Sequence, residues 1–181
     1  MTRKTKEEQR SALLGQLKKD IALNREFVDD KEAVFLSIAW TWTLVEKTGR
    51  TFFAAYGITD SQFNALMILW DYRASTLKQH ELADLLVVNR ASAGSLIDRL
   101  EKNKWIRRED DAADRRAYVV RLTDAGIAKM REVKTAYYKL LGGVTKGMDD
   151  DTLLAVLRFN NEFRRGLVDV VAAAEQKKSK K

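Results

Sequence analysis

The sequence of 181 residues contains no proline, no cysteine and only nine glycines. Because proline and glycine are the residues that most often interrupt helices, their scarcity favours long helices. Without cysteine, the chain has no disulfide, no thiolate metal site and no thiol that could sense oxidants. The single histidine, His80, argues against a zinc site, because such sites mostly recruit several His or Cys ligands. We therefore expect no metal and no cofactor.

Long apolar runs are also missing. The longest run is far shorter than the roughly 18 residues that a membrane span needs. The first residues, MTRKTKEEQRS, are polar and lack the apolar stretch of a signal peptide. A hydrophobic content of 45% is ample for a core, and the length suits one domain, alone or with a helical extension. We expect a soluble, cytoplasmic protein with no membrane partner.

The net charge of +7 is unevenly distributed along the chain. Residues 57–126 hold 11 basic and 11 acidic side chains, whereas the last ten residues hold four Lys and one Glu. A basic chain suggests a nucleic-acid partner. Since the middle of the chain is neutral, a binding face there must come from segregation of charge and not from its excess.

The N-terminal third predicts two helices. Residues 5–28 carry Leu13, Leu14, Leu17 and Ile21 at helical spacing, and the acidic DDKE at 29–32 suits the start of the next helix. Residues 33–55 are apolar nearly all round, so this helix should be buried on several sides, which suggests a partner chain. Its aromatic residues are Phe35, Trp40, Trp42, Phe52 and Phe53. Gly57 fits as the helix stop.

Three short helices and a hairpin are predicted next. Thr59 and Gln62 have capping-box spacing, as do Thr76 and Gln79 for the second helix. Asn89 can cap the third helix, residues 90–104. Residues 105–109 and 117–122 indicate two strands, the second with Tyr118, Val120 and Leu122 on one face.

Two long helices are predicted after the hairpin. The first covers residues 124–141 and ends at the pair Gly142 and Gly143. The second begins near Asp149 and runs to about residue 173. The lysine-rich residues after it are expected to form a frayed tail.

The helix predicted from residue 90 has two different faces. Ala93, Leu96, Ile97 and Leu100 form an apolar stripe. The opposite face carries small polar residues first and cations later: Ala91, Ser92, Ser95, Asp98, Arg99 and Lys102. Slender side chains allow a backbone to approach base edges in the major groove, and cations suit phosphates. The alternative is an ordinary solvated helix face.

The order helix, turn, helix and arginine-tipped hairpin favours DNA binding over that alternative, because it is the order of a winged helix-turn-helix. An arginine inserted into the minor groove exploits its negative potential, and Arg116 is the better placed candidate. Asp114 could orient this guanidinium, and the acids at 109–111 should point back towards the protein. Taken alone, the loop could equally be a solvated turn with weak salt bridges.

Residues 77–126 resemble the DNA-binding domain of the MarR (multiple antibiotic resistance regulator) family. The family's wing signature, Asp-x-Arg-x-x-x-Leu-x-Leu-Thr, falls on Asp114, Arg116, Val120, Leu122 and Thr123, with Val120 as one conservative departure. ELADLL, IDRLE and WIRR match the family pattern as well. The proline often found in the wing is replaced by Ala112-Ala113, and the N-terminus is longer than usual.

The resemblance implies a mainly α fold with a small β-wing: a winged helix-turn-helix domain plus N- and C-terminal dimerisation helices. It divides the chain into an N-terminal helical extension (1–31), dimerisation helices (32–56 and 127–175), a DNA-binding domain (57–126) and a basic tail (176–181). The role of residues 1–30 stays open between an extra helix at the dimer interface and a disordered arm.

The resemblance also implies a homodimer bound to double-stranded DNA at a pseudo-palindromic operator, with half-sites about one helical turn, roughly 34 Å, apart. The implied DNA-binding residues are Asn89, Arg90, Ala91, Ser92, Ser95, Arg99, Asp114, Arg115 and Arg116. Bases would be read by residues 90–92 and Ser95, Arg99 would lie near phosphates, and Arg115 and Arg116 would serve the wing.

The implied function is transcriptional regulation, usually repression that is relieved by a small aromatic or anionic effector. Trp40, Trp42, Trp70 and Arg73 are candidate pocket residues, although core packing is the alternative for each tryptophan. A second class is a sequence-tolerant architectural DNA-binding protein that uses the lysine-rich tail. An enzyme is not expected, because His80 has no nucleophile or carboxylate pair spaced for catalysis.

Overall fold

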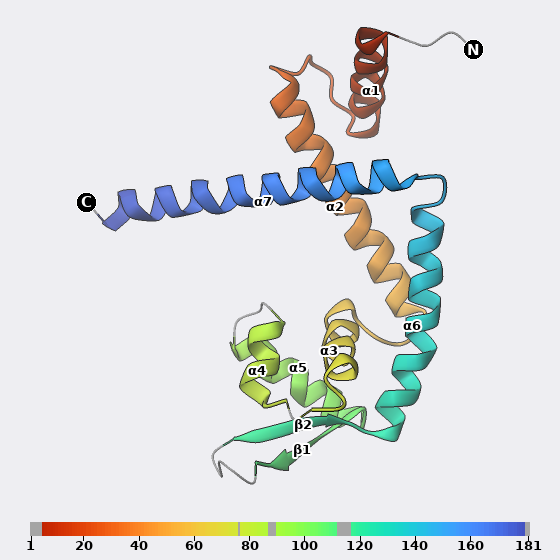
Figure 1. Ribbon diagram of the computed structural model, residues 1–181, viewed down its shortest axis with the longest axis vertical. Coiled ribbons are helices and arrows are strands. Elements are labelled where there is room, and N and C mark those ends of the chain that lie inside the picture. The colour runs from red at the N-terminus through yellow and green to blue at the C-terminus, as the bar shows by residue number, and fades with distance from the viewer. Residues whose placement is uncertain (1–4, 76, 87–89, 112–116, 180–181) are drawn as a thin grey trace. The chain divides into compact units, whose positions relative to one another are not determined.

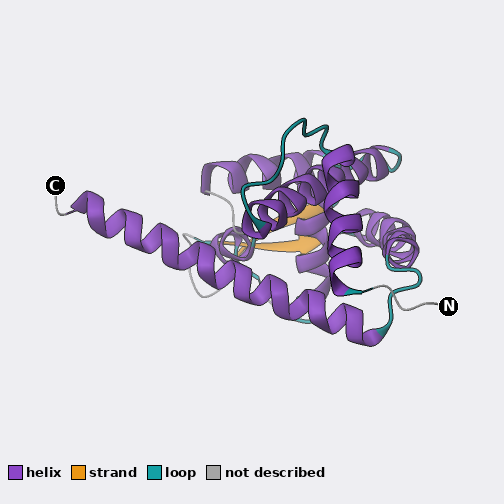
Figure 2. Cartoon of the chain, turned by 90° about the horizontal axis from the view of Figure 1, so that it is seen from above, coloured by secondary structure: helices purple, strands orange, loops and turns teal. Residues whose placement is uncertain are grey.

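The computed structural model describes residues 5–75, 77–86, 90–111 and 117–179, and for residues 90 and 91 only the helical backbone. The elements are α1 (Lys6–Asp20), α2 (Asp30–Ala54), α3 (Asp60–Asp71), α4 (Gln79–Leu85), α5 (Arg90–Lys102), β1 (Ile106–Asp110), β2 (Tyr118–Leu122), α6 (Asp124–Val144) and α7 (Asp150–Ser179) (Figure 1). The two strands form one antiparallel hairpin among helices (Figure 2). The predicted fold class, mainly α with a small β-wing, is therefore confirmed.

The chain divides into two compact units, Met1–Val133 and Lys134–Lys181. The first unit holds α1 to α5, the hairpin and the first half of α6. The second unit holds the end of α6 and the whole of α7.

Helix α1 is shorter than the predicted helix over 5–28. Thr5 and Glu8 form a capping box at its start, with the Thr5 N–H donating to Glu8 Oε2 at 2.9 Å. The chain turns away soon after Asp20, because Ala22 adopts a left-handed φ of 51°. No residue of α1 is buried. Of the two alternatives for this segment, a helix is therefore present, while its place at a dimer interface stays a prediction.

Helix α2 begins three residues before the predicted start at residue 33 and ends at Ala54, one residue before the predicted end. The Asp29 side chain accepts a hydrogen bond from the Glu32 N–H at 2.9 Å, and Gly57, at a φ of 64°, follows the last turn. Only Ala33 and Phe53 are buried along the whole helix. Phe35 is 55% exposed and Trp42 is 62% exposed. The expected burial on several sides is thus absent from the single chain.

The core of the first unit lies where α3, α4 and α5 pack together against the hairpin (Figure 1). Its fully buried large side chains come from five elements: Leu66, Leu82, Ile97, Leu100, Ile106, Met130 and Val133. Burying each such side chain is worth roughly 1.5–3 kcal/mol. Phe53 from α2 packs on Phe63 from α3, with ring centroids 4.9 Å apart. This packing gives α5 a firm base.

The predicted start of α4 and the predicted end of α6 were wrong. Helix α4 begins at Gln79 and not directly after Thr76, because Leu77 and Lys78 pair with β2: the Val120 N–H donates to the Leu77 carbonyl at 2.9 Å. Thr76 itself lies outside the described residues. Helix α6 continues through Gly142 and Gly143 to Val144, and the turn falls instead at Gly147, whose φ is 88°.

Helix α7 extends to Ser179, so the described part of the predicted tail is helical. Lys177 and Lys178 occupy its last turn, where cations interact favourably with the helix dipole. At its start, the Asp149 side chain caps the helix through the Thr152 N–H at 2.8 Å. A hydrogen bond with the Thr152 side chain is the largest influence on the pKa of Asp149 and lowers it, and the bond from the Thr152 N–H lowers it further.

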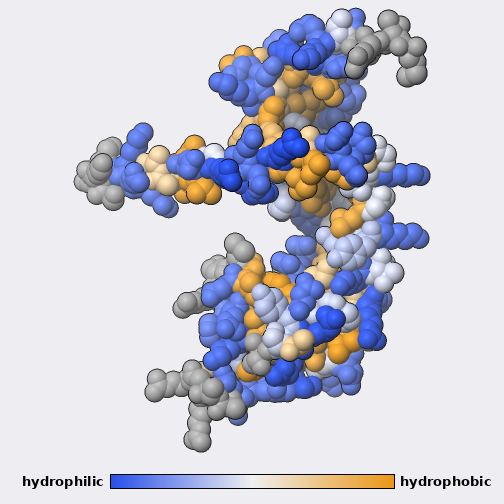
Figure 3. Space-filling view, in the orientation of Figure 1, coloured by the Kyte–Doolittle hydropathy of each residue, from blue (hydrophilic) through white to orange (hydrophobic). Residues whose placement is uncertain are grey.

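Apolar side chains follow one stripe of α7 at alternating spacings of three and four residues, interrupted by Asn160. The stripe consists of Leu153, Val156, Phe163, Leu167 and Val170. Leu167 is 46% exposed and Val170 is 69% exposed. Figure 3 shows apolar surface along this helix. Within the described ranges, no helix has both the length and the apolar character that crossing a membrane requires.

Candidate nucleic-acid interface

Helix α5 is anchored by the apolar stripe that the sequence predicts. Ala93, Leu96, Ile97 and Leu100 are exposed by only 1%, 3%, 0% and 0%. Because these four positions share one side of the helix, their burial fixes which side remains accessible. The predicted two-faced character of this helix is confirmed.

The accessible side of α5 is lined first by small polar residues and then by cations. Ser92 and Ser95 are exposed in the first turns, followed by Asp98, Arg99 and Lys102. The Arg99 Nε donates to the Ser95 carbonyl at 3.2 Å, so its guanidinium stem lies along the helix surface. This face combines room for close backbone approach with cationic donors at its far end.

The hairpin beside α5 is held on both sides. The strands pair from Ile106 with Leu122 to Asp110 with Tyr118, and the Asp111 N–H extends the ladder to the Ala117 carbonyl at 3.1 Å. Val119 and Val120 are both buried, because residues 77–78 pair with β2 at that level. Tyr118, Val120 and Leu122 share one face of β2 as predicted, but burial begins only after Tyr118, which is 51% exposed.

Two acidic residues near the loop end of the hairpin are turned towards cations of the protein. Glu109 accepts hydrogen bonds from Arg107 Nε at 2.6 Å and from Arg121 Nε at 2.9 Å, and these bonds lower its pKa. Asp111 is only 8% exposed and lies 2.7 Å from Lys78 Nζ. The prediction that the acids at 109–111 point back towards the protein is therefore confirmed for Glu109 and Asp111, while Asp110 is exposed.

Arg108 makes the most extensive set of contacts in this region, and sequence reasoning missed it. From β1, its Nε donates to Gln79 Oε1 at 3.0 Å and its Nη1 to Glu101 Oε2 at 2.7 Å, and its Nη2 pairs with Asp98. Burial is the largest influence on its pKa and lowers it, but Asp98 and Glu101 together outweigh burial and raise the pKa. The only sequence signal is two carboxylates at i, i+3 on α5, which does not identify their partner.

Thr123 and Gly126 fix the exit from the hairpin. The Thr123 Oγ1 donates to the Lys104 carbonyl at 2.6 Å and accepts from the Gly126 N–H at 3.1 Å, so it caps α6. The Thr123 N–H donates to the Trp105 carbonyl at 3.0 Å. A Cβ on Gly126 would lie 1.9 Å from that same carbonyl oxygen, so this close approach of the two backbones requires glycine.

Comparison with known proteins identifies this arrangement. The sequence model of the MarR family matches residues 58–118, from the start of α3 into the hairpin. Over these 61 of its 181 residues, the chain is similar to the MarR family. It is 27% identical over 144 residues to the uncharacterized HTH-type transcriptional regulator YsmB of Bacillus subtilis, covering 77% of this chain and 95% of YsmB. It is 35% identical over 79 residues to the transcriptional repressor MprA of Escherichia coli, covering 44% of this chain and 45% of MprA.

Solved structures of the MarR family share the fold. The crystal structure of Sco3205, a MarR family transcriptional regulator from Streptomyces coelicolor in complex with DNA, has a TM-score of 0.70 at 23% identity. The similarity covers 80% of this chain and 92% of Sco3205. The resemblance inferred from the sequence is confirmed, and the fold is that of MarR-type transcriptional regulators.

Several predicted DNA-binding residues lie outside the described residues. These are Asn89 before α5 and Asp114, Arg115 and Arg116 of the wing. Arg90 and Ala91 belong to the first turn of α5. The structure brings the exposed Ser92, Ser95 and Arg99 together on one helix face, and their contact with DNA stays a prediction.

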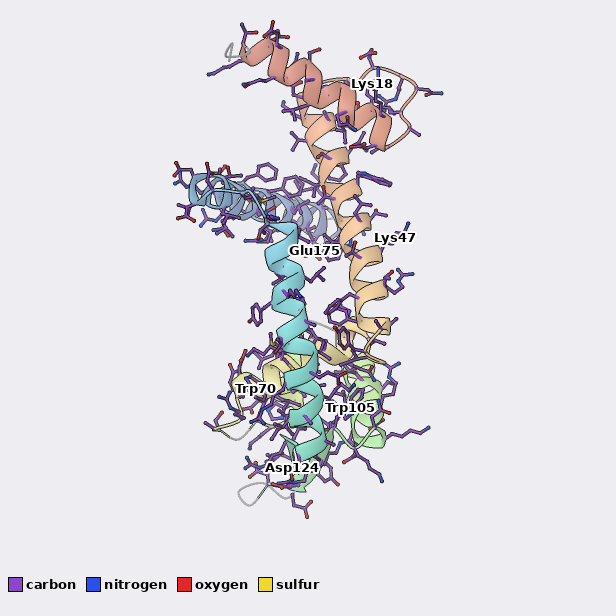
Figure 4. All side chains as sticks on the ribbon, turned by 90° about the vertical axis from the view of Figure 1, so that its right-hand side faces the viewer. Lys18, Lys47, Trp70, Trp105, Asp124 and Glu175 are labelled. Carbon is purple, nitrogen blue, oxygen red and sulfur yellow. The ribbon has the colours of Figure 1, made fainter. Side chains whose placement is uncertain are left out.

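The candidate ligand residues fall on two elements and the loop after the second. Trp40 is half-buried and Trp42 exposed on α2. Trp70, at the end of α3, is half-buried with two guanidinium groups near its ring: Arg73 at 4.7 Å and Arg131 at 5.9 Å from the centroid. The Lys129 ammonium lies 6.0 Å from the ring centroid of a second tryptophan, Trp105. Figure 4 labels both Trp70 and Trp105. An aromatic ring with cations nearby is a reasonable surface for an aromatic anion.

No three His, Cys, Asp or Glu side chains gather closely enough to hold a metal ion in the part of the chain that the structure describes.

Proposed function

We propose that this MarR-type regulator binds a pseudo-palindromic operator as a homodimer and represses transcription until a small ligand releases it. The observation that carries the proposal is the face of α5. Its opposite stripe is almost completely buried, and Ser92 and Ser95 stand exposed beside a firmly held hairpin. The role is binding without catalysis.

In this proposal α5 enters the major groove. Arg90, Ala91, Ser92 and Ser95 face base edges, and Arg99 contacts a phosphate. The wing lies along the duplex, with Arg115 near the backbone and Arg116 in the minor groove, where a narrow groove attracts a guanidinium. Because operator DNA lies in the cytoplasm, the protein acts there.

The proposed dimer is formed by α2, α6 and α7. Support comes from the large apolar side chains that a single chain leaves exposed on α2 and α7, among them Phe35, Trp42, Leu157 and Val168. An exposed apolar surface of this extent is typical of a protein–protein interface. Two copies related by a two-fold axis present two α5 helices to half-sites about one helical turn apart.

The proposed effector is a small aromatic or anionic molecule at Trp40, Trp42, Trp70 and Arg73. Such a ligand releases DNA only if it binds better to a dimer whose α5 helices are spaced wrongly for the operator. Thermal-shift measurements with phenolic acids, with and without operator DNA, test this. Compounds that stabilise the protein and weaken operator binding support the coupling, and stabilisation with unchanged affinity for the operator contradicts it.

The experiment that tests the DNA-binding proposal is selection of bound duplexes from a random pool. The dissociation constant for the selected duplex is then compared with that for a shuffled duplex at one fixed salt concentration. We expect a palindromic motif and a ratio of at least about 10³, the lower end for specific regulators. Equal affinities would instead favour the architectural, sequence-tolerant alternative, since phosphate contacts alone do not discriminate.

A further inference from the structure

Arg108 connects three elements of the winged helix-turn-helix through one guanidinium group. It lies on β1, and its partners are Gln79 in the first turn of α4 and the pair Asp98 and Glu101 on α5. Its backbone N–H also donates to Glu101 Oε1 at 3.1 Å. One strand residue thus holds both helices of the helix-turn-helix in a fixed relation to the wing.

The chemistry of these contacts requires arginine. The guanidinium is planar and carries five N–H donors in a fixed fork, so three acceptors in different directions also fix its orientation. A lysine ammonium at the same position is a single point that cannot span the three acceptors. The Arg108 side chain is 22% exposed, so its bonds are partly shielded from water.

The same contacts pair two carboxylates on α5 with the one positive charge of Arg108. Asp98 is 66% exposed and Glu101 39% exposed, on the helix whose neighbouring residues include Ser95 and Arg99. Carboxylates there would repel phosphates if they were not paired. Arg108 therefore acts on α5 in two ways, by orientation and by charge.

We propose that Arg108 is a positioning residue for operator recognition, which sets the angle and distance between α5 and the wing. This inference rests on the proposed function, because it matters only if α5 and the wing contact one duplex together. Direct base contact is not part of the role: Arg108 acts through Gln79, Asp98 and Glu101.

Arg108→Lys tests the proposal, and Arg107→Lys is the matched control. Both substitutions retain the net charge and lie on adjacent positions of β1, but Arg107 is exposed and pairs only with Glu109 among the contacts described for its side chain. For Arg108→Lys we expect the ratio of shuffled to selected dissociation constants to fall at least tenfold. The salt dependence and the affinity for shuffled duplex should stay unchanged. For Arg107→Lys the ratio should stay within twofold of wild type.

Asp98→Asn provides a second test that does not disturb the strand, with Asp84→Asn on α4 as its control. If Asp98 were merely a charge near DNA, its removal would tighten binding to both duplexes. If it anchors Arg108, binding to the shuffled duplex tightens while the ratio falls. Circular dichroism confirms that each variant is folded at the temperature of measurement.

The outcomes separate this inference from the proposed function. A wild-type chain that does not distinguish selected from shuffled duplex overturns the proposed function. A discriminating wild type with equal ratios for Arg108→Lys and Arg107→Lys, or an undiminished ratio for Asp98→Asn, overturns the positioning role alone.

Discussion

At the scale of single residues, a few positions tolerate one chemistry only. Gly126 is the clearest, because its Cα faces the Trp105 carbonyl at the junction of the hairpin and α6. Thr123 and Arg108 are similar, since the side chain of each forms hydrogen bonds with more than one segment. These residues fix the wing against the helices, and they are where substitutions should have the sharpest effects.

Gly126→Ala should destabilise the fold by about 1–3 kcal/mol, because a Cβ at 1.9 Å from a backbone oxygen forces the backbone to move. The control is Gly94→Ala on α5, where a Cβ meets nothing within 4 Å. Gly94→Ala should stabilise the fold by up to about 1 kcal/mol, because alanine has the higher helix propensity. Urea unfolding followed by circular dichroism measures both. Equal effects of the two substitutions would contradict the geometry at Gly126.

Glu32 predicts a pH effect at the junction of α1 and α2. The Arg25 guanidinium, with the Val28 N–H second, lowers the pKa of Glu32 from 4.5 to about 2. A depressed folded pKa contributes stability above the unfolded value, and this stability is lost as pH falls through the folded value. The junction should therefore loosen between about pH 4.5 and pH 2.

Nuclear magnetic resonance titration of the Glu32 side-chain carboxyl carbon measures this pKa directly. We expect a midpoint near 2 in the wild-type chain and a midpoint closer to 4.5 in Arg25→Gln. A wild-type midpoint at 4.5 would mean that the Arg25 contact does not persist in solution.

At the scale of elements, the sequence predicted identity and order better than boundaries. The stripe Ala93, Leu96, Ile97 and Leu100 is buried as predicted, because periodicity alone decides the face of a helix. The starts of α2 and α3 were also predictable, since Asp29 and Thr59 cap them through local hydrogen bonds.

What could not be predicted depends on contacts between distant segments. Helix α4 begins late because Leu77 and Lys78 pair with β2, some forty residues away. Gly142 and Gly143 do not end α6, because glycine weakens a helix without forbidding it. Arg108 was missed for the same reason: its partners Gln79 and Asp98 meet it only once the chain has folded.

Thr123→Val tests how the hairpin exit is held. Valine keeps the shape but loses the bond to the Lys104 carbonyl and the cap on the Gly126 N–H, so we expect a loss of about 1–2 kcal/mol. Thr41→Val is the control, because the Thr41 hydroxyl bonds only the carbonyl of Ser37 within α2. That loss should stay within about 0.5 kcal/mol. Thermal unfolding compares the two, and a smaller effect at Thr123 would contradict its role.

At the scale of the whole molecule, the exposed apolar faces are better explained by self-association than by a monomer. Three residues of the α7 stripe and two aromatic residues of α2 remain exposed in the single chain: Val156, Leu167, Val170, Phe35 and Trp42. The absence of proline and cysteine suits long helices with apolar stripes, and the proposed dimer would cover these faces.

Leu167→Arg should dissociate the proposed dimer, because it places a charge on the apolar stripe of α7. The control is Ala173→Arg, which adds the same charge at an exposed position on a different side of this helix from both Leu167 and Val168. Sedimentation velocity should show a dimer for the wild type and the control, and a monomer for Leu167→Arg. A monomeric wild type would contradict the proposed assembly.

The central claim is that α5 of each of two copies faces base edges in adjacent turns of one duplex. Because the chain has no cysteine, Ser95→Cys gives a single thiol to which an iron chelate that cleaves DNA can be attached. With the selected duplex, we expect two clusters of cuts about one helical turn, roughly 34 Å, apart. The same chelate on Lys47→Cys of α2 should give none above background. Scattered cuts from both positions, or no cuts from Ser95→Cys in a complex that still forms, would contradict the account.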